Sequence, residues 1–387
     1  MANDDSVHRV TTPAGDAAWL VSTYDDVRTL LGDGRLGRSH PDPEKASRSS
    51  RALMTGRPTG KPATESASTA LMRRLLGRLL AVRRVDPMRP RVQELVDALL
   101  DAVASRTPPV DLHAAVAARL PALVICEMLG IPKEDLDDFR RWSDDADDVL
   151  DHERSREGLR HLMAYMRDLA DRRRREPAGD LVSELVAARE PDQRLSDAAV
   201  AQLGTMLLFS GQRTTVMSID KGVTLLLANP EECAALRRDP ALIPQAVEEI
   251  LRCPYPWADR QAQAQARSQA QPDHGLPRYA LADIEVGGVT IPRGDMVLLR
   301  LHEANSDERV FAEPFRFDIC RTENQHVLFG YGPHYCLGAA LARIELQTVF
   351  ATLIRRFPTL RLTVPLEQLR MRSGVFTGGL AELPVSW

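Results

Sequence analysis

Hydrophobic residues recur at helical spacing through much of the middle of the chain. Apolar positions three and four residues apart form one face of a helix, so this spacing predicts amphipathic helices. We expect such helices over residues 92–103, 112–129, 134–149 and 157–175. A shorter helix is expected at residues 25–31, with an aspartate as its N-terminal cap.

A much longer helix is expected after Ser196, whose hydroxyl can cap a helix start. No proline follows until Pro230, which allows about 32 helical residues, or about 48 Å at the rise of an α-helix. Further helices are expected over residues 244–253 and from residue 337 to about residue 357.

β-Prone residues cluster near the N-terminus and again in the last third of the chain. They predict strands at residues 18–24, 278–280, 283–286, 289–291 and 296–301. The order of many helices, a few late strands and a final helix predicts a mainly α fold with minor β structure.

Two segments lack hydrophobic periodicity and are expected to be loops. Residues 40–68 are rich in Pro, Ser, Gly and Arg, and residues 254–276 are rich in Gln, Ala and Pro. Loops of this length are uncommon unless they are functional or disordered. Neither an internal repeat nor a clear linker divides the 387 residues.

Charge and composition exclude several classes of protein. The chain has 50 Lys and Arg against 54 Asp and Glu, and 44% of its residues are hydrophobic. This usage is ordinary for a globular protein and excludes a disordered or collagen-like chain. The near-neutral balance argues against a nucleic-acid binder. No uncharged apolar stretch is long enough to predict a membrane span.

The five cysteines are few and odd in number, and none forms a Cys-x-x-Cys pair; they are Cys126, Cys233, Cys253, Cys320 and Cys336. This pattern argues against a disulfide framework and a four-cysteine zinc site. Reduced thiols are typical of the cytoplasm, and the N-terminus has no apolar segment typical of a signal peptide. We therefore expect a cytoplasmic protein.

One cysteine has distinctive surroundings. A glycine-containing loop, residues 329–335, leads to Cys336, which we expect in the first turn of the helix that starts near residue 337. Glycines allow positive φ angles and close approach to a flat partner. A helix N-terminus favours a thiolate, so Cys336 could be a nucleophile, a redox sensor or a metal ligand. A buried structural cysteine is the alternative.

The pattern Phe-x-x-Gly-x-x-x-Cys-x-Gly resembles the haem-binding loop of the cytochrome P450 superfamily. The matching residues are Phe329, Gly332, Cys336 and Gly338. Other segments resemble soluble bacterial, actinomycete-like members: the Glu249–Arg252 pair, the segment containing Arg316, and strand-region residues 276–294. The resemblance covers nearly the whole chain and implies the cytochrome P450 fold, with residues 1–387 forming a single domain.

The resemblance also implies a cofactor, haem b. Cys336 would be its thiolate ligand, with Phe329, Gly330 and Gly338 in the surrounding loop. The haem propionates would be held by Arg73, Arg278 and His334. The segment before Arg73 departs from the family pattern, because Thr69 stands where relatives often have His, and Arg74 makes the register ambiguous. The resemblance assigns Glu249, Arg252 and Arg316 to a buried structural network.

The long helix contains a stretch, residues 206–215, that resembles the oxygen-activating helix of the family. Thr214 occupies the position of the alcohol that assists dioxygen. A Gly and two Thr in mid-helix weaken or bend it, because a threonine can bond back to the carbonyl four residues earlier. Helical spacing puts Met206, Phe209, Ser210 and Arg213 on one face, as the substrate pocket. Residues 41–66 and the helices around 140–175 would form a lid.

Arg213 departs from the family pattern, which has an acid at this position. An arginine cannot shuttle protons at physiological pH, because its pKa exceeds about 12. Three interpretations follow. Arg213 points away into a salt bridge while Thr214 and water relay protons, or it binds a substrate carboxylate or phosphate, or the enzyme does not use ordinary oxygen activation. We expect the second arrangement, with Arg213 facing the pocket.

The implied function is a haem-thiolate monooxygenase that hydroxylates or epoxidises a small secondary metabolite, such as a polyketide or macrolide. No flavin or iron–sulfur motif is present, so a ferredoxin and its reductase would supply electrons and O2 would be the oxidant. The cluster of arginines at 73–84 is either a docking face for the ferredoxin or a solvated helix face. Alternatives are peroxide-driven chemistry, coupling or rearrangement without oxygen insertion, and a non-enzymatic haem binder.

Overall fold

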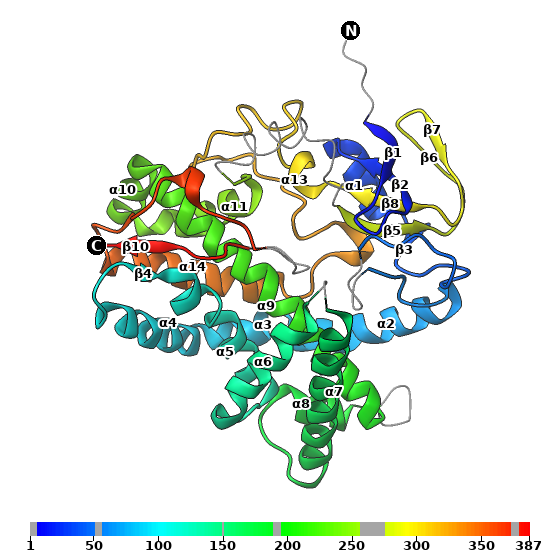
Figure 1. Cartoon of the computed structure of the whole chain (residues 1–387), viewed down its shortest axis with the longest axis horizontal. Coiled ribbons are helices and arrows are strands. Elements are labelled where there is room, and N and C mark those ends of the chain that lie inside the picture. Colours follow the sequence, from blue (N-terminus) through cyan, green and yellow to red (C-terminus); the bar gives the residue numbers. More distant parts are fainter. Residues whose placement is uncertain (1–5, 51–55, 149–150, 189–194, 256–274, 373–378) are drawn as a thin grey trace. The chain divides into compact units, whose positions relative to one another are not determined.

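The computed structural model describes residues 6–50, 56–148, 151–188, 195–255, 275–372 and 379–387. The chain forms two compact units, which we describe separately (Figure 1). The strand-rich unit contains residues 1–70 and 248–336, and the helical unit contains residues 71–247 and 337–387. The mainly α fold with minor β structure is confirmed.

The helical unit is organised around α9 (Asp197–Ala228), which is continuous over 32 residues. Ser196 caps it by accepting a hydrogen bond from the N–H of Ala199, as predicted. The other helices are α3 (Val82–Val85), α4 (Arg89–Ala104), α5 (Leu120–Leu129), α6 (Leu136–Ala146), α7 (His152–Arg175), α8 (Leu181–Ala187), α10 (Pro230–Arg238) and α14 (Ala339–Arg356). Because α5, α7 and α14 all pack against α9, its central turns are largely buried.

Short elements complete this unit. The strands β4 (Val110–Asp111), β10 (Pro384–Ser386) and β9 (Arg361–Leu362) form a three-stranded antiparallel sheet. The expected helix over residues 112–129 is instead a π-helical turn, η2 (His113–Ala117), followed by α5. Pro121 lies in the first turn of α5, where its missing N–H costs little, so the chain starts a new helix there.

The strand-rich unit contains a five-stranded sheet in the order β1-β2-β8-β5-β3. Its strands are β1 (Val7–Thr11), β2 (Ala17–Val21), β3 (Leu36–Gly37), β5 (Leu276–Ala280) and β8 (Met296–Leu299). Only the β2–β8 pair is parallel, with Trp19 opposite Val297. A separate hairpin joins β6 (Ile284–Val286) to β7 (Val289–Ile291), and α1 (Tyr24–Gly32) and α13 (Leu301–Ala304) are the helices confined to this unit.

The structure corrects several sequence expectations in this unit. Strand β1 was not predicted, because polar residues interrupt its pattern; Arg9 of this strand stacks on the ring of Trp19, 4.2 Å from its centroid. Thr23, not an aspartate, caps α1. The loop expected at 40–68 ends at residue 61, because α2 (Pro62–Leu79) begins with a proline, which suits the first turn of a helix. Helix α11 (Ile243–Arg252) matches the prediction.

Most of the segment expected as an inserted loop at 254–276 lies outside the described residues. Within the described part of the chain, no helix combines the length and apolar composition needed to cross a bilayer.

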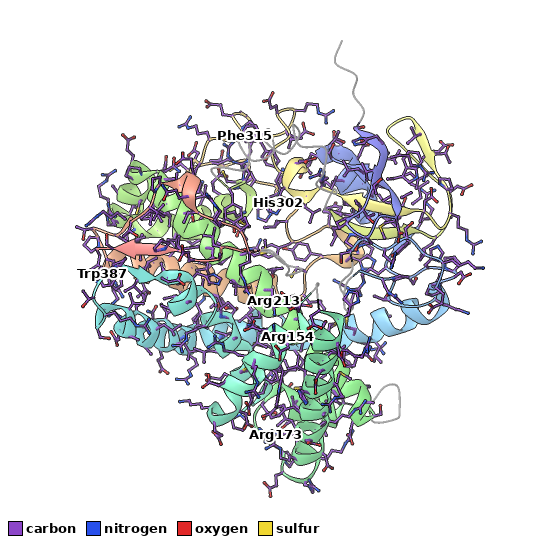
Figure 2. The ribbon with its side chains drawn as sticks, in the orientation of Figure 1. Arg154, Arg173, Arg213, His302, Phe315 and Trp387 are labelled. Carbon is purple, nitrogen blue, oxygen red and sulfur yellow. The ribbon has the colours of Figure 1, made fainter. Side chains whose placement is uncertain are left out.

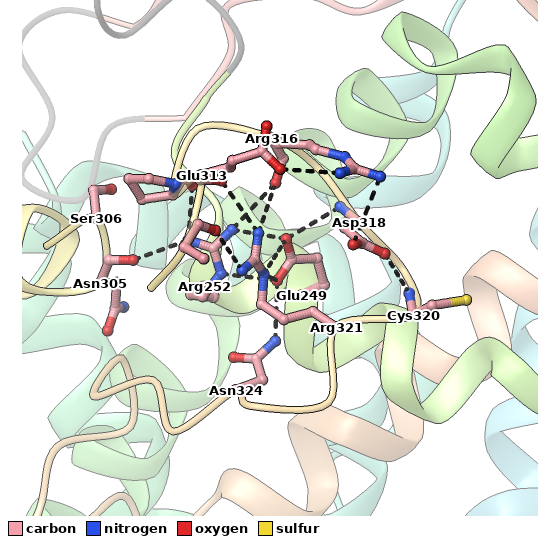
Figure 3. Close-up of polar contacts among 12 residues, drawn as sticks. Glu249, Arg252, Asn305, Ser306, Glu313, Arg316, Asp318, Cys320, Arg321 and Asn324 are labelled. Atoms are coloured by element: carbon pink, nitrogen blue, oxygen red, sulfur yellow. Dashed lines mark hydrogen bonds and ion pairs between the residues drawn. The ribbon is translucent and has the colours of Figure 1, made fainter. Parts of the chain in front are cut away.

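A buried charge cluster at the end of α11 organises the strand-rich unit (Figure 3). Glu249 and Arg252 are both 0% exposed. Arg252 donates from Nε to Oε2 of Glu249 at 2.8 Å and from Nη2 to Oε1 at 2.7 Å. Its Nη1 donates to the carbonyls of Asn305 and Pro314, at 3.0 and 2.8 Å. The cluster therefore ties α11 to the long segment that leads to the cysteine loop.

Arg321, not Arg316, supplies the second guanidinium of this cluster. Arg321 Nε lies 3.2 Å from Oε2 of Glu249, and its side chain is only 10% exposed. The side chain of Arg316 is 59% exposed and pairs with Glu313, while its carbonyl accepts a hydrogen bond from Arg252. The expectation for the Arg316 side chain is wrong because that residue lies on the outer side of the segment, and the chain turns back to Glu249 at Asp318.

We predict that Arg321→Ala destabilises the protein by about 3–5 kcal/mol, because removing one partner leaves the buried charge of Glu249 under-compensated. The matched control, Arg316→Ala, removes an exposed ion pair and should cost less than about 1 kcal/mol. Urea unfolding of both variants checks the difference. Equal losses would contradict the assignment of Arg321 to the cluster.

Candidate functional site

The loop that presents Cys336 is shaped by two glycines with positive φ angles, Gly330 at +75° and Gly332 at +64°. The N–H of Cys336 donates to the carbonyl of Phe329 at 2.8 Å, which closes the loop around the 3-10 turn η5 (Gly332–His334). The Cys336 side chain is exposed, and none of the five cysteines is in a disulfide. The loop therefore offers a single accessible sulfur.

Cys336 does not lie in the first turn of the following helix, contrary to expectation. Helix α14 begins at Ala339, with Gly338 as its cap. The backbone N–H of Cys336 is committed to Phe329, so the chain becomes helical only after the loop has closed. The glycine loop, more than the helix terminus, determines the position of the sulfur.

The cysteine loop is anchored on α1 within the strand-rich unit. A Cβ added to Gly332 would lie 2.9 Å from Cα of Gly32, so only glycine fits there without a shift. Next to it, the ring of Tyr331 lies under the guanidinium of Arg28, 4.7 Å from the centroid. The loop is also tied to the buried charge cluster, because the N–H of Val327 donates to Oδ1 of Asn305 at 2.8 Å.

The loop suits a flat cofactor that brings most of its own metal ligands. Within the described residues, no group of three or more His, Cys, Asp and Glu side chains could hold a metal ion. A single exposed cysteine is a poor site for a bare metal ion but is sufficient for haem, which needs one protein thiolate. A Cβ added to Gly338 would meet no atom within 4 Å, so this side of the loop is open.

The residues expected around the propionates lie in different elements. Arg278 is buried in β5, where its Nη1 donates to the carbonyl of Pro277 at 2.8 Å. His334 is half-buried in η5, and Phe329 is half-buried between the rings of His326 and Tyr335. Arg73 is half-buried in the part of α2 that belongs to the helical unit.

The middle of α9 has an accessible stripe in an otherwise buried helix. Ser210 and Thr214, one turn apart, are exposed, while Met206 and Phe209 are half-buried beside them. Oγ1 of Thr214 donates to the carbonyl of Ser210 at 3.2 Å, the local bond expected from the sequence. The helix remains continuous through these residues, so the weakening predicted there does not break it.

Arg213 turns away from this stripe towards α6 (Figure 2). It is 7% exposed, its Nη1 lies 2.5 Å from Oδ2 of Asp147, and its Nη2 donates to the carbonyl of Ser143 at 2.8 Å. These are the contacts of the salt-bridge interpretation. The expected pocket-facing anchor is not observed, because a carboxylate of the chain itself already pairs with the guanidinium.

Sequence reasoning missed Asp147, although it lies in an unusually acidic run at 144–148. Burial raises the pKa of Asp147 to about 6, and the charges of Arg213 and Arg372 oppose this rise. Burial also lowers the pKa of Arg213, against the charges of Asp147 and Asp144. At neutral pH the pair is ionised, whereas mild acid neutralises Asp147.

A second buried pair, His113 and Asp220, was also missed. Nδ1 of His113 lies 2.8 Å from Oδ2 of Asp220, whose side chain is 0% exposed. Burial opposes protonation of His113, but the hydrogen bond and the charge of Asp220 outweigh it and raise the pKa of the imidazole. Because Asp220 lies on α9 and His113 on η2, this pair fixes the imidazole against the long helix.

Comparison with known proteins identifies the family to which this arrangement is similar. The family model for cytochrome P450 matches residues 269–375. Pentalenolactone synthase of Streptomyces exfoliatus is 40% identical over 100% of this chain and 94% of that protein. Mycinamicin IV hydroxylase/epoxidase of Micromonospora griseorubida is 40% identical over 99% of this chain and 93% of that protein.

A solved structure is similar to this chain in both fold and sequence. The putative thioether synthase SgvP, described as involved in the tailoring step of griseoviridin, matches with a TM-score of 0.88 and 35% identity. The match covers 99% of this chain and 94% of that chain. The similarity in sequence and fold therefore extends well beyond the cysteine loop.

We predict a pH-dependent stability contribution from Asp147. Its pKa is about 6 in the native protein against 3.8 for an unperturbed aspartate, so between these values the native state holds a proton that the unfolded chain has released. The contribution of this group to the free energy of unfolding should therefore fall by on the order of 3 kcal/mol as the pH rises through this window.

Denaturant titrations of the wild type and Asp147→Asn across this pH range isolate the effect, because the variant cannot titrate at this position. The stability of the wild type relative to the variant should decrease with rising pH. An increase would mean that the ion pair with Arg213 dominates over burial.

Proposed function

Because this chain belongs to the cytochrome P450 family and is a monooxygenase, an oxidoreductase, we propose that it inserts oxygen into a secondary metabolite at a haem b ligated by Cys336. The main support is one observation: an exposed cysteine, not in a disulfide, at the end of a glycine-shaped loop that matches the haem loop of the family. We also propose that the two units together form one cytochrome P450 domain, since relatives align over the whole chain.

Bound haem would supply the iron that activates dioxygen, and a thiolate ligand favours O–O cleavage over reversible oxygen storage. In this proposal, Gly330 and Gly332 give the loop the shape that leaves the Cys336 sulfur accessible. Arg278 and His334 of the strand-rich unit and Arg73 of the helical unit would pair with the propionates. Phe329 and Gly338 would border the cofactor.

Thr214 would hold or pass a proton at its Oγ1. The exposure of this residue supports the role, as does its hydrogen bond to Ser210, which orients the hydroxyl. Arg213 takes no part as an acid, because its side chain is paired with Asp147 and a guanidinium does not release its proton at neutral pH. Proton delivery would therefore depend on Thr214 and water.

The names of the relatives support the substrate class. The mycinamicin relative is named a hydroxylase and epoxidase, and the other is named for pentalenolactone. We propose a secondary metabolite, such as a polyketide or macrolide, hydroxylated or epoxidised next to the accessible stripe of α9. Met206 and Phe209 would contact its apolar part and Ser210 would offer a hydroxyl.

Electrons would come from a ferredoxin and its reductase in the cytoplasm. Arg74, Arg78 and Arg83 are exposed on or beside α2 and would contribute to a basic docking face. Arg84 is paired with Glu184, which reduces its contribution. Peroxide-driven, coupling or rearrangement chemistry is the alternative. The residue that favours this alternative is Arg213, and its pairing with Asp147 weakens the case.

Turnover assays separate the two chemistries. Candidate metabolites should be incubated with NADPH, a ferredoxin and its reductase, or with peroxide alone, and the products identified by accurate mass. We expect a product that is one oxygen atom heavier than the substrate, either an alcohol or an epoxide. Its formation should require NADPH. Product formed only with peroxide would favour the alternative.

We predict that Cys336→Ala abolishes the red-shifted Soret band of the reduced carbon monoxide adduct, because no thiolate remains to ligate the iron. Cys320→Ala is the matched control, since Cys320 is the other exposed thiol, and it should retain the band. Retention of the band in Cys336→Ala would refute the assignment of the ligand.

We predict that Thr214→Val diverts electrons from NADPH into hydrogen peroxide, because the hydroxyl that holds a proton at this point of α9 is lost. Thr214→Ser keeps the hydroxyl and should restore the coupling. The measurement is peroxide formed per NADPH consumed. The same ratio in the wild type and Thr214→Val would remove Thr214 from the proposed proton route.

A further inference from the structure

A cavity of about 200 Å³ lies in the helical unit beside α9. Its polar lining comes from η2, α6, α9 and the segment before residue 373, and consists of His113, Arg140, Asp144, Gln212, Arg213 and Arg372. We propose that this cavity binds the carboxylate of an acidic substrate. The inference that the ligand is a substrate rests on the proposed function. The inference that the ligand is an anion rests on the cavity alone.

The cations around the cavity are incompletely balanced. Three guanidiniums and one carboxylate, that of Asp144, line the cavity, and Asp147 pairs with Arg213 from behind. His113 is hydrogen-bonded to Asp220 behind the cavity. The lining itself is therefore mainly cationic, which favours an anionic group such as a carboxylate.

Two of the three guanidiniums are available to a ligand. Arg213 is held by Asp147 and Ser143, but the side chains of Arg140 and Arg372 form no hydrogen bond or ion pair with any residue that the structure describes. Arg372 is exposed and Arg140 is half-buried, so both can be reached. A guanidinium presents two parallel donors that match the two oxygens of a carboxylate.

Buried donors point to the same conclusion. Arg213 is 7% exposed, yet its Nε has no hydrogen-bond partner among the described residues. A buried donor without a partner is costly, and a bound anion would satisfy it. Nδ1 of His113 is fixed by Asp220, which leaves Nε2 of the same ring free of any hydrogen bond within the described part of the chain.

The position and size of the cavity define what part of the substrate it would take. At about 200 Å³ it is smaller than the pockets of roughly 300–1,000 Å³ that hold whole drug-sized ligands. Gln212 and Arg213 line it, and the next residue along α9 is Thr214. A cavity of this size would take only the acidic end of a larger molecule.

Calorimetric titration of the haem-loaded protein with 4-phenylbutyrate and with its uncharged amide tests the proposal. The acid should bind at least about 10-fold more tightly than the amide. In Arg372→Gln and Arg140→Gln the affinity for the acid should fall by about 10- to 150-fold, the effect of losing a charge-assisted hydrogen bond. The affinity for the amide should not change.

Arg141→Gln is the matched control, because Arg141 is the neighbouring arginine of α6 but is 63% exposed and paired with Asp138. It should bind the acid as the wild type does. Equal affinities of the wild type for acid and amide, no measurable binding of the acid, or equal losses in Arg141→Gln and Arg140→Gln would each overturn the proposal.

A second arm distinguishes a substrate from a free anion. Titration with inorganic phosphate, or competition by it, should have little effect on binding of the acid. Displacement of the acid by phosphate at similar concentrations would overturn the substrate assignment and favour a site for free anions. Calorimetry does not depend on the iron ligand, so a preference for the acid in protein without a thiolate spectrum would refute the proposed function while the cavity assignment stands.

Discussion

The strand-rich unit depends most on the interactions of one buried carboxylate, that of Glu249. It is fully buried and is reached by two guanidiniums, one amide side chain and one backbone N–H. An ionised group at this depth is tolerable only when all these partners are present, so their segments must assemble together. Arg252 then connects through Asn305 to Val327, where the cysteine loop begins. The charge cluster thus helps to fix the segment that leads to the Cys336 sulfur.

The polar residues of helix α9 lie on two sides of the helix, one accessible and one buried. Ser210 and Thr214 stay accessible, while Arg213 and Asp220 are turned inwards to partners on α6 and η2. A rotation of 100° per residue is enough to separate neighbours such as Arg213 and Thr214. Arg213 therefore need not disturb Thr214, its neighbour in sequence. In this chain it contributes instead to packing and to the charge of a neighbouring cavity.

The sequence predicted the structural elements whose ends are set by local signals. It did not predict contacts between side chains that are distant along the chain. Ser196 and Pro230 bracket α9 correctly because capping and proline act locally. The cysteine loop was recognisable because Gly330 and Gly332 have positive φ angles, which glycine adopts readily. By contrast, Arg316 and Arg321 are equivalent by composition, and only the tertiary path of the segment selects Arg321. The partner of Arg213 lay 66 residues away in the chain, beyond any local pattern.

The parallel pairing of β2 with β8 has a consequence for how the chain is made. Residue 21 leaves the ribosome long before residue 296, and at 5–20 residues per second the interval is roughly 15–55 s. During that time the whole of residues 71–247 is synthesised and can fold locally, while β2 has no β8 to pair with. Trp19, Leu20 and Val21 can pair with β1 in this interval, but the opposite edge of β2 stays open in the nascent protein, and an open apolar edge is prone to aggregation. The sheet therefore closes late, after residue 299 has been made.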